Sequence, residues 1–336
     1  MREQISRHIA MLARSADLDR LIKWSGQTTI FPFYHGLAEE TLPHISHLYR
    51  VRTPEEFERD LESLLKYFEP ISLEDHLEDH LEKSGKARNK KGMLLTFDDG
   101  LKECHQFIAP LLKKKGIPAV FFLNNKFIDN HGLFYRYKAS LIIHQVREDC
   151  RVMERVSAFL KIPQVHVEKS LRMIGPHQNS LLDSLAIEAG IDFFTYLKDS
   201  PVYMDTGEVK ELLKWGFDIG GHSMDHQNFT SLTPEEMIEQ VRMSIEDLMK
   251  RFSVDTRYFS FPFTSDGVPG KVIHRLLDEG IATALMGTAG LKKTGRPDYI
   301  QRIPMEGLRA SALETLQTEY FYYLLKAPLG KNRLRY

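Results

Sequence analysis

The 336-residue chain has only two cysteines, Cys104 and Cys150, and no long uninterrupted run of apolar residues. Two cysteines are too few for a disulfide framework, and their spacing matches no metal-binding motif, which suits a reducing compartment. We expect both to be buried thiols. A membrane-spanning helix needs about 18 or more consecutive apolar residues, so the sequence predicts none.

The chain also lacks an excess of charge of either sign, because 46 acidic residues nearly cancel 45 basic ones. No overall field therefore favours nucleic acid, and contact with a membrane would need a local cluster. The C-terminal segment YFYYLLKAPLGKNRLRY mixes aromatic and basic residues as interfacial anchors do, although a packed helix with a solvated tail is the alternative. The charged N-terminus has no apolar stretch typical of a signal peptide. We expect a cytoplasmic protein that can associate with a membrane, and the oligomeric state stays open.

Short apolar runs rich in β-branched and aromatic residues alternate with amphipathic stretches, which is typical of βα units and a parallel sheet. The expected strands are residues 28–34, 93–97, 119–123, 217–220, 258–263, 281–286 and 300–303. Two helices are expected to begin at the Thr-Pro-Glu-Glu sequences of Thr53 and Thr233, which favour capping boxes. With 42% hydrophobic residues, the chain can bury the core of a barrel-type domain.

The alternation breaks between about residues 124 and 204, where the sequence is mostly helical and has no strand of its own. We interpret this stretch as an insertion after the strand AVFFL. Loops that follow barrel strands lie on the face where catalysis occurs, so the insertion should overhang the active site. Its deletion is expected to spare the barrel and a bound metal and to change the substrate range.

The segment LLTFDDG ends an apolar strand in two adjacent carboxylates, Asp98 and Asp99. Strand ends are where barrels keep catalytic groups. Adjacent residues that leave a strand point in different directions, so one carboxylate can bind a cation while the other faces the substrate and acts as a base. The alternative is that one aspartate only caps the following helix.

The segment GGHSMDH places His222 and His226 four residues apart. A single helical turn would bring both imidazoles to one side. Together with Asp99 they would supply the three protein ligands of a catalytic zinc site. Paired histidines are also common on solvated or buried helix faces, so this pair alone is weak evidence for a metal site. The two motifs at successive strand ends are stronger evidence than either motif alone.

With TFDDG and HSxxH both present, the chain resembles the polysaccharide deacetylase family with the NodB homology domain, carbohydrate esterase family four. The similarity extends over most of residues 28–123 and 216–305. It implies an α/β fold, a distorted (β/α)7 TIM-like barrel with the large, mostly helical insertion. The implied layout is an N-terminal helical extension at 1–27, the barrel at 28–310 with the insertion at about 124–204, and a C-terminal helix and basic tail at 311–336.

The resemblance implies a role for each matched residue. Asp98 would be the general base, and Asp99, His222 and His226 would hold one divalent ion, Zn²⁺ with Co²⁺ or Ni²⁺ as alternatives. The ion would polarise the acetamide carbonyl and lower the pKa of its bound water. The substrate would be an N-acetylated saccharide in a glycan, glycolipid or saccharide precursor.

The family's third motif has the variant form FSFPFTSDG, in which Phe263 stands where a tyrosine is usual and Thr264 replaces a glycine. The backbone N–H of Phe263 would help hold the tetrahedral oxyanion. Asp298 and Arg302 resemble the segment in which this family places an arginine near the catalytic aspartate. Arg302 is therefore expected to orient Asp98, with a surface ion pair as the alternative.

The late histidine that serves as general acid in most of the family has no counterpart here, because His274 lies inside an expected helix. The chain is more similar to the biofilm-polysaccharide N-deacetylases, whose motif order is permuted and whose acid follows an early strand. His35 in FPFYHGL matches that place, although it could merely pack at a strand end. Two further functions stay open: a catalytically silent carbohydrate-binding barrel, and a metallohydrolase acting on another amide.

Overall fold

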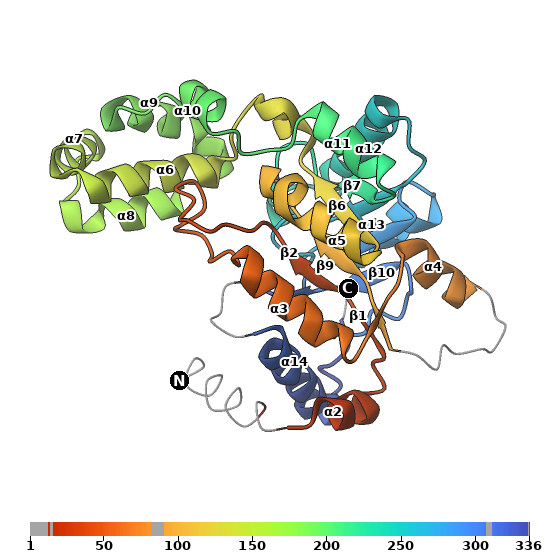
Figure 1. Ribbon diagram of the computed structural model, residues 1–336. Coiled ribbons are helices and arrows are strands. Elements are labelled where there is room, and N and C mark those ends of the chain that lie inside the picture. The colour runs from red at the N-terminus through yellow and green to blue at the C-terminus, as the bar shows by residue number, and fades with distance from the viewer. Residues whose placement is uncertain (1–12, 14–15, 82–90, 307–310, 335) are drawn as a thin grey trace.

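The computed structural model describes residues 13, 16–81, 91–306, 311–334 and 336 (Figure 1). The strands are β1 (Thr29–Ile30), β2 (Pro32–Tyr34), β3 (Glu69–Pro70), β4 (Gly92–Met93), β5 (Leu95–Phe97), β6 (Ala119–Leu123), β7 (Asp218–Gly221), β8 (Tyr258–Ser260), β9 (Ala284–Gly287), β10 (Tyr299–Gln301) and β11 (Ile303–Pro304). The helices around them are α2 (Leu18–Ser25), α3 (Pro54–Leu65), α4 (Leu73–Leu81), α5 (Ala109–Lys115), α11 (Thr206–Lys214), α12 (Pro234–Phe252), α13 (Gly270–Asp278) and α14 (Ala312–Lys326), with the single turns η1 (Cys104–Ile108), η4 (Phe229–Ser231) and η5 (Ala327–Leu329).

A parallel sheet in the order β10-β9-β8-β7-β6-β5-β2-β11 forms the barrel. Its two end segments are halves of one strand, because only Arg302 separates β10 from β11 in the chain. The first half pairs with β9 and the second with β2, so this strand closes a ring of seven. The expected (β/α)7 barrel is confirmed, and Arg302 lies at its seam.

Alternating side chains of β6 show how the barrel is filled. Val120 and Phe122 belong to an apolar cluster with residues of β8, β9 and β10, whereas Phe121 and Leu123 pack in the cluster formed with the surrounding helices. Both faces of the strand are therefore buried, which explains why AVFFL is apolar throughout and does not alternate with polar residues.

The strand boundaries differ from the expected ones where a strand is interrupted. The run at 28–34 divides into β1 and β2, and the run at 92–97 divides into β4 and β5. The first members of both pairs join β3 in a separate three-stranded sheet, which the sequence did not predict. The strand expected to reach Phe263 ends at Ser260, because Pro262 has no N–H for a ladder bond.

Both predicted capping boxes are confirmed, at Thr53 before α3 and at Thr233 before α12. The expectation of two buried thiols is wrong for one of them. Cys104 is buried, whereas Cys150 is exposed at the start of α7 (Cys150–Leu160). Helix α7 packs against other helices of the insertion, and Cys150 begins it on the exposed side.

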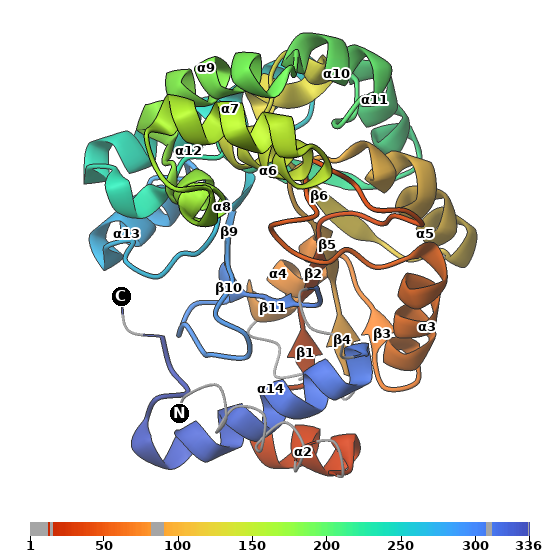
Figure 2. The same cartoon turned by 90° about the vertical axis from the view of Figure 1, so that its left-hand side faces the viewer.

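The insertion is helical, as expected, and projects from one end of the barrel (Figure 1). Besides α7 it contains η2 (Asn125–Asn130), α6 (Tyr135–Glu148), α8 (Gln164–Met173), η3 (Pro176–Gln178), α9 (Asn179–Ala189) and α10 (Phe193–Asp199). Figure 2 shows these helices above the barrel, and α2 and α14 below it. A separate apolar cluster holds the insertion together.

The two terminal segments lie side by side, since α2 packs against α14. Most of the expected N-terminal extension, residues 1–12, 14 and 15, lies outside the described residues, as does part of the boundary near 310. Among the described residues, no helix is both long and apolar enough to cross a membrane. The basic tail pairs with the β9–β10 loop through Lys293 and Arg333, and its contact with a membrane stays a prediction.

Candidate active site

Four predicted site residues follow the carboxyl ends of β5 and β7, which flank β6 in the barrel. The backbone N–H of Asp98 bonds to Tyr34 O of β2, and that of His222 bonds to Leu123 O of β6, so both stay attached to the rim. These two residues, like Asp99 and His226, are each at most 5% exposed. The rim of the barrel therefore brings together both sequence motifs.

The backbone of TFDDG turns sharply after the strand. Asp99 has φ 71° and Gly100 has φ 67°, both in the left-handed region. That region is strained for most residues, but glycine adopts it freely and aspartate tolerates it better than bulkier side chains. The turn aims the Asp99 carboxylate at the two histidines, whereas Asp98 points toward Arg302.

The histidines do not lie on a helical turn, so that expectation is wrong. Residues 222–226 form an irregular loop in which Ser223 and His226 have φ 67° and 58°. Two left-handed residues fold the loop back, and the ring centroids of His222 and His226 come within 5.0 Å. The two imidazoles therefore meet because of the conformation of this loop, which helical periodicity does not predict.

Asp99, His222 and His226 form the metal-type cluster found among the described residues, with ligand atoms within 4.8 Å of one another. Oδ1 of Asp99 lies 3.5 Å from Nε2 of His222 and 3.2 Å from Nε2 of His226. Ligand atoms about 2.0 to 2.1 Å from a tetrahedral zinc ion lie roughly 3.3 Å apart. The two separations from Asp99 match that spacing, and the atoms of the two histidines lie within 4.8 Å of each other.

The protonation of His222 also fits a metal ligand. Its Nδ1 lies 2.8 Å from the carbonyl oxygen of Ser260, so Nδ1–H donates and Nε2 presents its lone pair to the cluster. Burial lowers the pKa of His222 to about 4, against the opposing charge of Asp98. The imidazole is therefore neutral at pH 7, as metal coordination requires.

Asp98 is held by a buried guanidinium. Nη1 and Nη2 of Arg302 lie 2.7 Å and 2.6 Å from its two carboxylate oxygens, and Arg302 is fully buried. Burial alone would raise the pKa of Asp98, but the charge and hydrogen bonds of Arg302, together with the charges of His222 and His35, outweigh it and the pKa is lowered. The alternative of a surface ion pair is wrong for Arg302. Asp298 pairs with Arg296 instead.

His35 follows β2, directly beside Asp98 on the neighbouring strand. Its Nδ1 lies 2.5 Å from Oε2 of Glu306, and Glu306 also accepts from the His35 backbone N–H. Burial lowers the pKa of His35, but Glu306, with smaller contributions from Asp99 and Asp98, raises it to about 9. The imidazole is therefore protonated at neutral pH, and its Nδ1 is engaged by Glu306.

Phe263 lies beside the cluster, with its ring centroid 4.5 Å from that of His226. Its φ of 61° shows that the strained position of the variant third motif is Phe263 itself and not Thr264. The guanidinium of Arg136 lies 4.5 Å from the centroid of the Phe263 ring. Phe263 thus joins the histidine loop to the insertion, in addition to the backbone role predicted for it.

Sequence reasoning missed several partners of these residues. Tyr137 Oη donates to Oδ2 of Asp99 at 2.8 Å, Asn124 Nδ2 donates to Oδ1 at 3.2 Å, and Ser260 Oγ accepts from Arg302 at 2.6 Å. Burial and the Asp99 charge raise the pKa of Tyr137, so its hydroxyl stays protonated. Residue spacing cannot show which carboxylate a buried hydroxyl meets.

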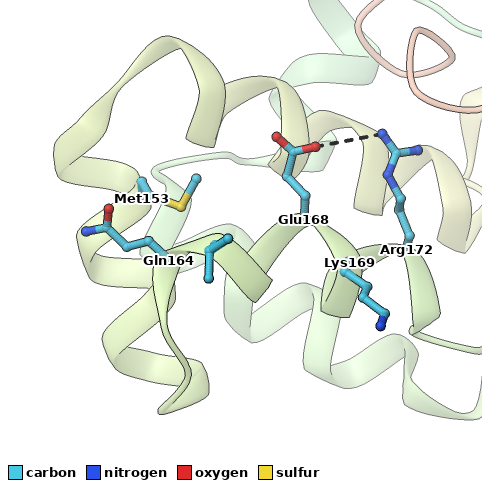
Figure 3. Close-up of a pocket in the computed structure, with 6 residues that line it drawn as sticks. Met153, Gln164, Glu168, Lys169 and Arg172 are labelled. Carbon is cyan, nitrogen blue, oxygen red and sulfur yellow. Dashed lines mark ion pairs between the residues drawn. The ribbon is translucent and has the colours of Figure 1, made fainter.

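One surface pocket of about 600 Å³ lies away from these residues, on α7 and α8 of the insertion (Figure 3). Six side chains line it: Met153, Gln164, Val165, Glu168, Lys169 and Arg172. Its one acidic group is neutralised, since Glu168 lies 2.5 Å from Arg147 and 3.9 Å from Arg172. The pocket shares no residue with the rim of the barrel, and we assign it no part in the chemistry.

Comparison with known proteins accounts for this site. Residues 85–276 match the family model described as polysaccharide deacetylase. The chain belongs to the polysaccharide deacetylase family. The match contains both the TFDDG and the HSxxH motif and confirms the predicted family. A polysaccharide deacetylase removes N-acetyl groups by hydrolysis, so this chain is a carbohydrate deacetylase. His35, Arg302 and Glu306 lie outside the matched residues, and of these three only Glu306 was not predicted from the sequence.

Solved structures agree with the fold. The structure of IcaB from Ammonifex degensii is 14% identical, with a TM-score of 0.54, over 87% of this chain and 97% of that one. The deacetylase PplD from Streptococcus pyogenes, solved in complex with acetate, gives the same identity, TM-score and coverage. No curated protein matches the chain at a significant level.

Proposed function

We propose that this deacetylase is metal-dependent and hydrolyses the N-acetyl groups of amino sugars, with Asp99, His222 and His226 as metal ligands. The observation that carries the proposal is the cluster of three buried ligand atoms within 4.8 Å of one another, next to a carboxylate held by Arg302. A divalent ion bound there would polarise the acetamide carbonyl and lower the pKa of water.

Three further groups would take part in proton transfer and in binding the oxyanion. Asp98 is ionised and oriented by Arg302, so it can take a proton from the attacking water. The backbone N–H of Phe263 would help hold the tetrahedral oxyanion. His35 carries a proton at neutral pH and can pass it to the leaving amine. Asp98, His35 and Phe263 follow β5, β2 and β8, so all three lie at the same rim of the parallel barrel.

Acetate release tests the function and the metal site together. Purified protein supplied with Zn²⁺, Co²⁺ or Ni²⁺ should bind about one ion per chain and release acetate from N-acetylglucosamine oligomers. His222→Ala combined with His226→Ala removes two ligands, so elemental analysis should find little bound metal and the assay little acetate. Replacing the exposed His166 and His177 by Ala is the matched control, because neither belongs to the cluster. Undiminished metal in the first pair would refute the ligand assignment.

The proposed acid has its own test. His35→Ala should lower kcat by about 10²- to 10⁴-fold with the metal retained. Because His35 must be protonated to act and Glu306 raises its pKa to about 9, activity should fall as the pH rises through that value. Glu306→Gln should therefore move the alkaline limb of the kcat profile to lower pH.

The control for that shift is Glu211→Gln, which breaks a different histidine–glutamate pair. Nε2 of His105 lies 2.9 Å from a carboxylate oxygen of Glu211 on the surface. The profile of this variant should match that of the wild type. An alkaline limb that stays in place in Glu306→Gln would mean that another group donates the proton.

The two other functions named from the sequence are separated by the same assays. A catalytically silent barrel would bind the metal and release no acetate from any N-acetylated saccharide. A metallohydrolase for another amide would keep the metal and the pH profile but act on a different substrate. The intact set of Asp98, Arg302, His35 and Glu306 favours the deacetylase, since a binding barrel needs neither a proton acceptor nor a proton donor.

A further inference from the structure

The hydroxyl of Tyr137 reaches the metal cluster from the insertion. Tyr137 lies in the first turn of α6, is 1% exposed, and donates to Oδ2 of Asp99 at 2.8 Å. The other oxygen of Asp99, Oδ1, faces His222 and His226. The insertion thus contacts the carboxylate at the oxygen that the ligand cluster does not use.

We propose that Tyr137 is a positioning residue for metal binding, by which the helical insertion fixes the orientation of the Asp99 carboxylate. The inference rests on the proposed metal site. It adds that a hydrogen bond from the insertion holds the Asp99 carboxylate in one orientation. A carboxylate can rotate about its last side-chain bond, and a hydrogen bond to one oxygen holds the other toward the ion. Such outer partners of metal ligands typically contribute 10- to 100-fold in metal affinity.

A second tyrosine supports the first. The hydroxyl groups of Tyr49 and Tyr137 lie 3.2 Å apart. Because the Tyr137 proton goes to Asp99, the Tyr49 hydroxyl must donate to Tyr137. The ring of Tyr49 also stacks on His35, with centroids 4.5 Å apart. One hydrogen-bonded chain therefore connects the proposed ligand Asp99 with the residue that packs against the proposed acid.

Phe134, which immediately precedes α6, strengthens the case that this part of the insertion belongs to the site. Its ring centroid lies 4.2 Å from that of His226 and 5.2 Å from that of Tyr137. Its backbone N–H donates to the hydroxyl of Tyr203, near the end of the insertion. Both ends of the insertion thus hold α6 against the cluster. These contacts argue against the expectation that the insertion could be deleted without effect on the metal.

The test is the affinity of Tyr137→Phe for Zn²⁺, measured by competition with a chelator on protein whose circular dichroism matches that of the wild type. This variant removes one hydroxyl and keeps the ring, so the dissociation constant should rise about 10- to 100-fold. Tyr196→Phe is the matched control. Its hydroxyl, on α10 of the same insertion, bonds to His44 at 2.9 Å, and its Zn²⁺ affinity should stay at the wild-type value.

A second variant keeps the inference testable if Tyr137→Phe does not fold. Tyr49→Phe removes only the supporting donor, so it should weaken Zn²⁺ binding in the same direction by a smaller factor. Wild-type affinity in Tyr137→Phe, or an equal loss in Tyr196→Phe, would overturn the inference while leaving the metal site intact. A wild-type protein that binds no metal at all would instead overturn the proposed function.

Discussion

Asp98→Asn should lower kcat for acetate release by about 10²- to 10⁴-fold while the metal content stays at the wild-type value. The substitution removes a proton acceptor and leaves the three proposed ligands in place. Acetate release and elemental analysis on the same preparation check both halves of this result. Retention of most of the activity would mean that Asp98 is not the base.

The structure shows that Asp98→Asn should also affect stability, which the sequence did not reveal. Arg302 is fully buried and pairs with Asp98, so the asparagine variant leaves its charge without a counter-charge. Breaking a buried pair in this way typically costs about 3–5 kcal/mol. Rates must therefore be compared per folded molecule. Asp298→Asn is the control, because Arg296, its partner, is only partly buried and the loss should be about 1 kcal/mol or less with activity retained.

Arg302→Met should lower the free energy of unfolding by about 3–5 kcal/mol, because it leaves the Asp98 carboxylate buried and unpaired. Urea unfolding of the metal-free protein measures this loss. Arg296→Met is the control and should cost about 1 kcal/mol or less, since that pair remains in contact with solvent. Similar losses in the two variants would show that Arg302 is not held as the structure places it.

The pH dependence of this loss has a defined sign. In the wild type the pKa of Asp98 is lowered, so its contribution to stability is present above its unfolded pKa and is lost as the pH falls. Without Arg302, burial still raises that pKa while the largest influence that lowers it is gone, so the folded state takes up a proton more readily than it does in the wild type. The loss caused by Arg302→Met should therefore shrink as the pH is lowered. The double variant Asp98→Asn with Arg302→Met should cost less than the sum of the two single variants, because neither charge remains.

The sequence by itself determined the parts of this protein that depend on neighbouring residues. Apolar runs that end in TFDDG and GGHSMDH identified the strands and the ligand types, because strand ends place polar groups on the rim of a barrel. The capping boxes at Thr53 and Thr233 were equally local. A break in the alternation of strands and helices was enough to locate the insertion, because that alternation depends only on local composition and spacing.

Only the tertiary structure decided which distant groups meet. Glu306 reaches His35 across 271 residues, and Tyr137 reaches Asp99 from the insertion. The family resemblance had already predicted that Arg302 meets Asp98, and the structure adds that this pair is fully buried on the Arg302 side. The left-handed conformations of Ser223 and His226 likewise replaced the expected helical turn. The physical reason is the same in each case: these contacts follow from closure of the barrel at Arg302 and from packing of α6 on its rim. Neither is encoded in local spacing, because each depends on where the rest of the chain has folded.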